Sequence, residues 1–300
     1  MLEALFLGTG AGIPSRQRSV PGLAVRIAGE IVLLDCGEGT QRQLMVSPFS
    51  FMKIEGIFIT HLHGDHILGL PGLLMTIGMS NRGRSLMLCG PPGIRKWIDD
   101  CLSACCEDLR YELNIIEAED DLTMTFKGYS ITAFATEHEV HSLGFKVLES
   151  PSRRFHKDII SENNLTSKDL RSIKSGHTVN GITYEDATYL VPGTSLVYTG
   201  DTVPCDSVRR HSIEADVLVH ESTFMDSERD LAIKHGHSTS LQAADIAKGC
   251  NCEALILTHI SGRYKDTTDM LNEAKSIFEN TFIAEDMDLF EIGRGRIRLT

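Results

Sequence analysis

The sequence lacks the features that mark a membrane or secreted protein. No stretch of its 300 residues approaches the apolar length needed to cross a bilayer. The first residues, Met1–Gly12, have neither the basic start nor the long apolar middle of a signal peptide. We therefore expect a soluble, cytoplasmic protein with no membrane partner.

Basic residues are also scarce. The chain has 29 Lys and Arg against 41 Asp and Glu, which gives a formal net charge of -12. A protein that binds nucleic acid over its whole surface is normally basic. If RNA is the substrate, a local basic patch or bound metal ions must supply the attraction.

The eight cysteines do not predict a disulfide-stapled scaffold in a chain of this length. Cys105 and Cys106 are adjacent, and Cys250 and Cys252 form a C-x-C pair, but no second pair has zinc-finger spacing. We expect small buried thiols, with a zinc–thiolate site as the alternative.

Short apolar runs alternate with segments of helical spacing, and hydrophobic residues make up 42% of the chain. The pattern predicts an α/β protein in which two sheets are covered by helices. The run Gly56–His61 resembles Ala254–His259, as a duplicated half-domain would. We expect strands at 2–7, 23–27, 31–34, 54–60, 129–136, 144–148, 196–199, 217–220 and 254–258, and helices at 66–79, 93–105, 239–248 and 267–278.

The composition changes over residues 150–193. This stretch is rich in Ser, Lys, Arg and Asn and has no continuous apolar run. We expect an arm inserted into one domain that spans residues 1–300.

The strongest chemical signal is His61-Leu62-His63-Gly64-Asp65-His66, directly after a predicted strand. Imidazole nitrogen and carboxylate oxygen are ligands that suit zinc, and manganese also accepts them. We expect Gly64 to permit a tight backbone turn within this loop. Since six residues cannot complete the ligands of two ions, further ligands are expected at other strand ends. The candidates there are His138, Asp201 and His259.

The H-x-H-x-D-H pattern resembles the signature of the metallo-β-lactamase superfamily, and other segments resemble ribonuclease Z motifs in the same order. These segments are Asp35–Gln43, His138–Phe145, Leu196–Thr202, His220–Phe224, His237–Thr239 and Leu257–Tyr264. The resemblance implies a four-layer αββα sandwich and two zinc ions per chain, with manganese as the alternative.

The same resemblance implies a ligand for each position. His61, His63 and His138 would hold one zinc ion, and Asp65, His66 and His259 would hold the other, with Asp201 between them. His141 competes with His138. We choose His138 because the Ser-x-Gly-Phe element begins four residues after it, as in the family motif.

The implied reaction is cleavage of a phosphodiester by metal-activated water. Asp65 would accept the proton of that water. His237 would protonate the leaving oxygen, and Glu221 would orient His237. The alternative is that His237 only precedes a helix start and that Glu221 only satisfies backbone donors.

Resemblance further implies a precursor tRNA substrate, cut to remove its 3′ trailer, and a homodimer. The arm would bind RNA through Arg153, Arg154, Lys168, Arg171 and Lys174, although its tip lacks the Gly-Pro motif of the family. A solvated charged loop is the alternative. Arg263 and Tyr264 are placed to contact a phosphate and a base, whereas Arg16 and Arg18 fit an RNA-end loop or an ordinary turn.

A rival reading keeps the same metal site but assigns a small phosphodiester or an aryl sulfate as substrate. The acidic composition and the altered arm tip favour it. A non-catalytic protein with a structural metal site is disfavoured, because all seven expected ligand positions carry a metal-binding residue type.

Overall fold

The computed structural model describes residues 2–105 and 108–300. It divides the chain into two compact units, a main unit of Met1–Leu148 and Thr194–Thr300 and an arm of Glu149–Gly193. The predicted site residues near strand ends all belong to the main unit.

The main unit contains an eight-stranded sheet with the order β17-β16-β1-β2-β3-β4-β5-β6. Strands β3, β4, β5 and β6 run parallel, while the strands on the other side of β3 pair antiparallel. Its strands are β1 Leu2–Gly8, β2 Gly22–Ile27, β3 Glu30–Leu34, β4 Ile54–Phe58, β5 Leu86–Gly90, β6 Leu113–Glu117, β16 Leu289–Gly293 and β17 Arg296–Leu299.

A seven-stranded sheet has the order β15-β14-β13-β12-β9-β8-β7. Strands β12, β13, β14 and β15 run parallel, which repeats the mixture of strand directions in the first sheet. Its strands are β7 Leu122–Phe126, β8 Tyr129–Thr136, β9 Ser142–Glu149, β12 Ser195–Tyr198, β13 Val217–Glu221, β14 Ala254–Thr258 and β15 Thr281–Ile283.

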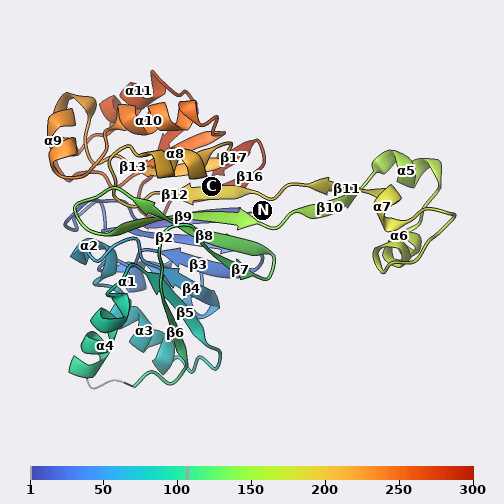
Figure 1. Ribbon diagram of the computed structural model, residues 1–300, viewed down its shortest axis with the longest axis horizontal. Coiled ribbons are helices and arrows are strands. Elements are labelled where there is room, and N and C mark those ends of the chain that lie inside the picture. The colour runs from blue at the N-terminus through green and yellow to red at the C-terminus, as the bar shows by residue number, and fades with distance from the viewer. Residues whose placement is uncertain (1, 106–107) are drawn as a thin grey trace. The chain divides into compact units, whose positions relative to one another are not determined.

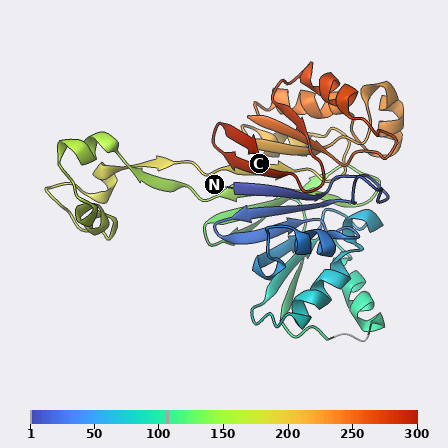
Figure 2. The same cartoon turned by 180° about the vertical axis from the view of Figure 1, so that it is seen from behind.

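Three apolar clusters show that the two sheets and the helices form four layers. The central cluster takes residues from both sheets, for example Phe6 and Phe290 of the first and Phe145 and Val219 of the second. A second cluster lies between the first sheet and its helices, and a third lies between the second sheet and its own helices. Figures 1 and 2 show these helices on the two outer faces of the main unit. The predicted arrangement of two helix-covered sheets is therefore confirmed.

The helices of the main unit are short. The structure shows no helix, within residues 2–105 and 108–300, long and apolar enough to cross a membrane. They are α1 Thr40–Val46, η1 Phe51–Lys53, α2 Gly64–Ile67, α3 Leu70–Met79, α4 Ile94–Ala104, α8 Asp206–Ser212, η2 Asp226–Glu228, α9 Arg229–Lys234, α10 Ser240–Gly249 and α11 Thr268–Lys275.

The single helix predicted over 66–79 is wrong, because the chain breaks it into α2 and α3 at Leu68-Gly69. Gly69 packs so closely on Gly37 that an added Cβ would lie 2.0 Å from the Gly37 carbonyl oxygen. Pro71 then lies in the first turn of α3, where proline is well tolerated. The tight turn expected at Gly64 is also absent, since Gly64 begins α2 and is not among the residues with positive φ.

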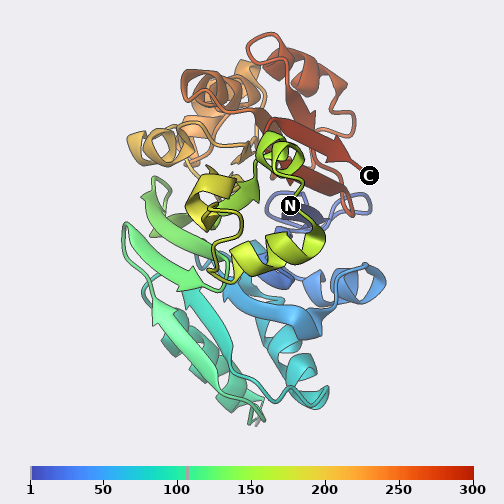
Figure 3. The same cartoon turned by 90° about the vertical axis from the view of Figure 1, so that its right-hand side faces the viewer.

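The arm consists of a two-stranded antiparallel ribbon and three short helices, which Figure 3 shows in yellow-green. A small apolar cluster that includes Leu165, Ile173 and Ala187 gives it a core of its own. Its elements are β10 Ser152–Phe155, α5 Lys157–Glu162, α6 Ser167–Lys174, α7 Tyr184–Ala187 and β11 Thr188–Val191.

The cysteines give no sign of a thiolate metal site in the part of the chain that the structure describes. Cys250 and Cys252 are buried, and each thiol contacts a backbone carbonyl. No group of potential metal ligands among the described residues contains a cysteine. Cys106 lies outside the described residues.

Candidate metal centre

The predicted ligands converge because strands of both sheets end at one place. His61 and His63 follow β4, Asp65 and His66 lie on α2, and the remaining three follow β8, β12 and β14. Potential ligand atoms lie within 4.8 Å of one another in overlapping groups. The groups are His61, His63 and His138; His61, His66 and Asp201; Asp65, His66 and His259; and Asp201, His237 and His259. His138 is part of these groups, whereas His141 is not.

Four buried atoms in this cluster have no hydrogen-bond partner among the described residues. They are Nε2 of His61, His66 and His259, and Oδ1 of Asp201. Buried polar atoms are normally paired, so four such atoms at one place need an explanation. Metal ions bound by these nitrogens and oxygens would satisfy them, and the donor set fits zinc.

Asp35 orients His66. Its carboxylate is buried and accepts a hydrogen bond from His66 Nδ1 at 2.8 Å, which leaves Nε2 directed at the cluster. Asp35 also accepts from the hydroxyl of Tyr198 at 2.9 Å. Burial opposes the charged form of His66, but Asp201 and Asp35 outweigh it and raise the pKa of the ring well above its ordinary value.

Thr60 extends this support to His61. Its backbone N–H and its hydroxyl both donate to Asp35, at 2.8 and 3.0 Å. The hydroxyl oxygen then accepts from Nδ1 of His61 at 3.0 Å. Burial and the neighbouring His66 ring lower the pKa of His61 well below its ordinary value, so this ring is neutral and ready to bind a metal.

His63 and His138 complete the exposed side of the cluster. Nδ1 of His138 donates to the Gly236 carbonyl at 2.8 Å, which leaves Nε2 on the side of His63, 3.3 Å from its Nδ1. Burial lowers the pKa of His63, and the His138 ring lowers it further. The His63 ring can therefore offer a neutral nitrogen to an ion.

Two carboxylates lie among the histidines. Asp201 Oδ2 is 3.4 Å from Nε2 of both His66 and His259 and 3.7 Å from that of His61, a position between the two ligand sets. Asp65 Oδ2 is 3.5 Å from His259 Nε2 and accepts from the Gly12 N–H at 2.9 Å. Burial opposes ionisation of Asp65, but His259 and His66 hold its pKa below the usual range, so it is a carboxylate.

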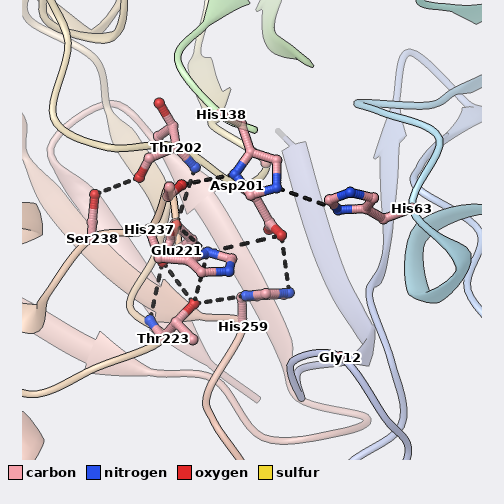
Figure 4. A network of polar contacts seen from close by, with 12 residues as sticks. Gly12, His63, His138, Asp201, Thr202, Glu221, Thr223, His237, Ser238 and His259 are labelled. Atoms are coloured by element: carbon pink, nitrogen blue, oxygen red, sulfur yellow. Dashed lines mark hydrogen bonds and ion pairs between the residues drawn. The ribbon is translucent and has the colours of Figure 1, made fainter. Parts of the chain in front are cut away.

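Glu221 pairs with His237 (Figure 4). Its Oε1 accepts from His237 Nδ1 at 2.8 Å and from the Thr202 N–H at 3.1 Å. Burial lowers the pKa of His237, but the Glu221 carboxylate outweighs it and raises that pKa to about 9. The His237 side chain is 15% exposed and lines the cavity, so a cationic ring can meet a ligand there.

Thr223 links Glu221 to His259. The Thr223 backbone N–H and hydroxyl donate to Glu221 Oε2, at 3.1 and 2.8 Å. The same hydroxyl oxygen accepts from Nδ1 of His259 at 2.9 Å, which fixes that ring with Nε2 toward Asp65 and Asp201. His259 adopts a left-handed backbone (φ 57°), so its placement stores local strain.

A cavity of about 390 Å³ opens over the cluster. Its lining includes five of the seven predicted metal ligands together with His237, and the Phe224 and Leu231 side chains form an apolar wall. Arg263 is the one Lys or Arg among the described lining residues. The cavity can therefore present an anionic ligand to the histidine–aspartate cluster, to the imidazole of His237 and to the guanidinium of Arg263.

The residues expected from the sequence to contact RNA near the cluster differ in their surroundings. Arg18 is inserted into the fold, where its Nη1 donates to the Thr9 hydroxyl and the Ala284 carbonyl, each at 2.6 Å. That is a structural role, whereas Arg16 is exposed. Tyr264 is held by Glu228 and accepts from the Met225 N–H at 3.0 Å.

The arm is less basic than its Lys and Arg content suggests. Six basic residues in 149–193 are matched by six acidic ones, so its formal net charge is zero. Arg153 donates to the Thr188 hydroxyl at 2.8 Å and is therefore part of the arm's own structure. Lys168, Arg171 and Lys174 lie on α6, at the helical spacing predicted for them.

Sequence reasoning missed the residues behind the ligands. Asp35 lies in one of the segments that resemble ribonuclease Z motifs, but its role is not evident from the sequence, and neither are the roles of Thr60, Tyr198 and Thr223. The available signal was a hydroxyl or carboxylate placed at a strand end beside a ligand histidine. Nothing in the sequence shows that Tyr198 reaches Asp35 from 163 positions away.

Two helix-covered mixed sheets with a histidine–aspartate cluster at their strand ends define the metallo-β-lactamase fold. The structure of YhfI from Bacillus subtilis, described as a metallo-β-lactamase fold protein, superposes with a TM-score of 0.71 at 20% identity, covering 97% of this chain and 99% of that one. The predicted α/β fold class is confirmed. This likeness shows the fold alone.

Closer relatives specify the family. Ribonuclease Z of Sulfolobus acidocaldarius is 39% identical over 295 residues, 97% of this chain and 98% of that protein. Ribonuclease Z of Exiguobacterium sibiricum is 41% identical over 293 residues, 95% and 97% of the two chains. The short form of human tRNase Z is 30% identical with a TM-score of 0.73, covering 97% and 99%. The chain belongs to the ribonuclease Z family.

Residues 2–246 also match, and so belong to, the family described as anti-Pycsar protein Apyc1. This match includes the histidine loop, Asp201 and His237 but ends before His259. The ribonuclease Z relatives match over nearly the whole chain, so they describe the complete cluster better.

Proposed function

We propose that the protein is a metal-dependent endoribonuclease that removes the 3′ trailer from precursor tRNA. One observation carries the proposal. A chain that matches ribonucleases Z almost from end to end also gathers three unpartnered imidazole nitrogens and a carboxylate oxygen beneath a cavity. The active protein would be cytoplasmic.

The seven predicted ligands fit two ions, for which zinc is the best candidate and manganese the alternative. His61, His63 and His138 would form one set, and Asp65, His66 and His259 the other, with Asp201 between them. Two bound divalent ions would lower the pKa of a water molecule and stabilise charge on the phosphoryl oxygens.

The remaining roles follow from protonation states. Asp65 is a carboxylate beside the cluster and can accept a proton from water. His237 is held cationic by Glu221 and can donate a proton to the leaving oxygen. Glu221 is a positioning residue, because its carboxylate contacts His237 and Thr223 rather than the cavity.

RNA binding would use Arg263 at the cavity and exposed basic residues of the arm. Arg154, Lys168, Arg171 and Lys174 are candidates, while Arg153 is mainly occupied within the arm. We propose that the main unit is a single metallo-β-lactamase domain, that the arm is its inserted RNA-binding element, and that the protein is a homodimer.

A small phosphodiester or aryl sulfate is the second candidate substrate. The formal net charge of -12 and the electrically neutral arm favour it. The metal cluster would serve either substrate, so only substrate tests separate the two functions.

The test compares a 3′-extended precursor tRNA with bis(p-nitrophenyl) phosphate, using the metal-loaded protein and mapping RNA ends. We expect one cut beside the discriminator base. Asp65→Ala should abolish it, whereas Asp99→Ala, which changes an exposed residue on α4, should not. Hydrolysis of the small diester with intact precursor tRNA would contradict the RNA assignment and support the second candidate.

A further inference from the structure

Arg263 is held against the cavity wall by three contacts. Its guanidinium carbon lies 4.9 Å above the centre of the Phe224 ring, and its Nε donates to the Ser261 hydroxyl at 3.2 Å. Its Nη1 donates to Glu228 Oε1 at 2.5 Å. The Arg263 side chain is 42% exposed, so a ligand in the cavity can reach it.

Glu228, the last residue of η2, contacts both Arg263 and Tyr264. Its second oxygen accepts the Tyr264 hydroxyl, which in turn accepts the Met225 N–H at 3.0 Å. α9 begins at the next residue and contributes Leu231 to the same cavity. The carboxylate therefore joins the segment before α9 to the loop after β14.

A guanidinium recognises a carboxylate and a phosphate through the same planar N–H geometry. In this structure Nη1 of Arg263 donates to a carboxylate oxygen of Glu228. We propose that Glu228 is a specificity-determining residue whose carboxylate competes with an anionic phosphate of the substrate for Arg263. This inference rests on the proposed action on a phosphodiester.

The competition between Glu228 and a substrate phosphate distinguishes substrates by how many charged phosphates they carry. An exposed ion pair of this kind is weak, so a substrate phosphate can displace Glu228 at small cost. A small diester has a single phosphate and no others that could bind elsewhere on the protein, whereas RNA brings neighbouring phosphates that also interact with the protein. Glu228 therefore weakens the binding of small diesters more than that of RNA.

The test is the variant Glu228→Gln, which keeps an acceptor for Tyr264 but removes the charge. We expect the KM for bis(p-nitrophenyl) phosphate to fall by about two- to fivefold with kcat unchanged, and the KM for RNA to change less. Glu55→Gln is the matched control, because Glu55 pairs with Arg84 at 2.6 Å and does not line the cavity. It should leave both constants unchanged.

A double-mutant cycle decides whether the effect passes through Arg263. In an Arg263→Ala background, Glu228→Gln should no longer change KM. An unchanged or raised KM in Glu228→Gln, or a fall that persists without Arg263, would overturn the inference, and a lowered Tm would then indicate a structural role for Glu228. Because the small diester is the probe, failure to cut precursor tRNA would refute the proposed function without deciding this inference.

Discussion

The two halves of the main unit support the cluster with matching networks. Asp35 follows β3 and Glu221 ends β13, and each lies beside a parallel strand followed by a ligand histidine. Each carboxylate accepts the N–H and the hydroxyl of one threonine, plus one imidazole Nδ1. In both halves that threonine hydroxyl also accepts from a second imidazole, at His61 and at His259.

The networks differ in what the paired imidazole can reach. Asp35 holds His66, which is fully buried and directs its free nitrogen at the cluster. Glu221 holds His237, which lines the cavity. In the proposed mechanism one hydrogen-bond arrangement serves two purposes, because the buried His66 of the Asp35 network would bind metal and the cavity-lining His237 of the Glu221 network would transfer a proton.

The largest expected effect comes from removing the His237 imidazole, which lines the cavity. His237→Ala should lower kcat on precursor tRNA by about 10²- to 10⁴-fold, the range of general acid–base catalysis. The kcat on bis(p-nitrophenyl) phosphate should fall by roughly tenfold at most, because its nitrophenolate leaves without needing a proton. His235→Ala is the control, as His235 is an exposed histidine of the same cavity. Equal losses on both substrates would contradict the acid role.

The next largest effect should fall on metal binding. Asp35→Asn removes the charge that orients His66 and leaves buried donors without full partners, so metal affinity should fall by about 10- to 100-fold. Chelator competition measures this, with circular dichroism as the folding check. Asp99→Asn on the exposed face of α4 should change nothing. Retained affinity in a folded Asp35→Asn protein would show that the Asp35 network is not needed to bind metal.

Glu221→Gln should change the pH dependence instead. Because Glu221 raises the pKa of His237 to about 9, the ring is protonated below that pH and loses its proton as the pH rises through it. Without the carboxylate charge, the alkaline limb of the pH–kcat profile should move to lower pH by about one to two units. An unmoved limb in a protein with normal metal content would contradict the pairing. Bound metal ions lower the limb in both proteins, so the difference is the informative quantity.

The smallest effects are expected from replacing the two threonines whose hydroxyls support ligand histidines. Thr60→Val and Thr223→Val each remove one hydroxyl that supports one ligand imidazole. Each should lower the affinity for one ion by about tenfold and leave the other ion bound. Metal titration followed by elemental analysis measures both. If the two variants lose the same ion, the networks do not serve separate sets of ligands.

Much of the fold was predictable because buried strands carry continuous apolar runs. β8 and β14 have the predicted boundaries, since their mainly apolar runs end at polar residues. β6 and β7 were not predicted, because they lie at sheet edges and mix exposed with half-buried residues. The break between α2 and α3 was missed because it depends on the contact of Gly69 with Gly37, which only the folded chain brings together.

In the site, the ligands were predictable from the sequence but the residues that support them were not. The ligand candidates were visible because four metal-binding residues occur within six positions and the others follow apolar strands. Their supports were not visible, because a hydrogen bond such as Tyr198 to Asp35 joins the two halves and leaves no local pattern. The ion pair between Arg263 and Glu228 could not be predicted for the same reason.

The arm leaves and re-enters the main unit at neighbouring points. Leu148 of β9 pairs with Ser195 of β12, and Gly193 lies so close to Glu149 that an added Cβ would be 1.6 Å from its carbonyl oxygen. In the second sheet, β9 and β12 therefore pair like the two strands of a β-hairpin, and the whole arm takes the place of the hairpin loop. Strand register is already set before the arm begins, so the segment can be lengthened, shortened or exchanged during evolution while the catalytic domain stays the same.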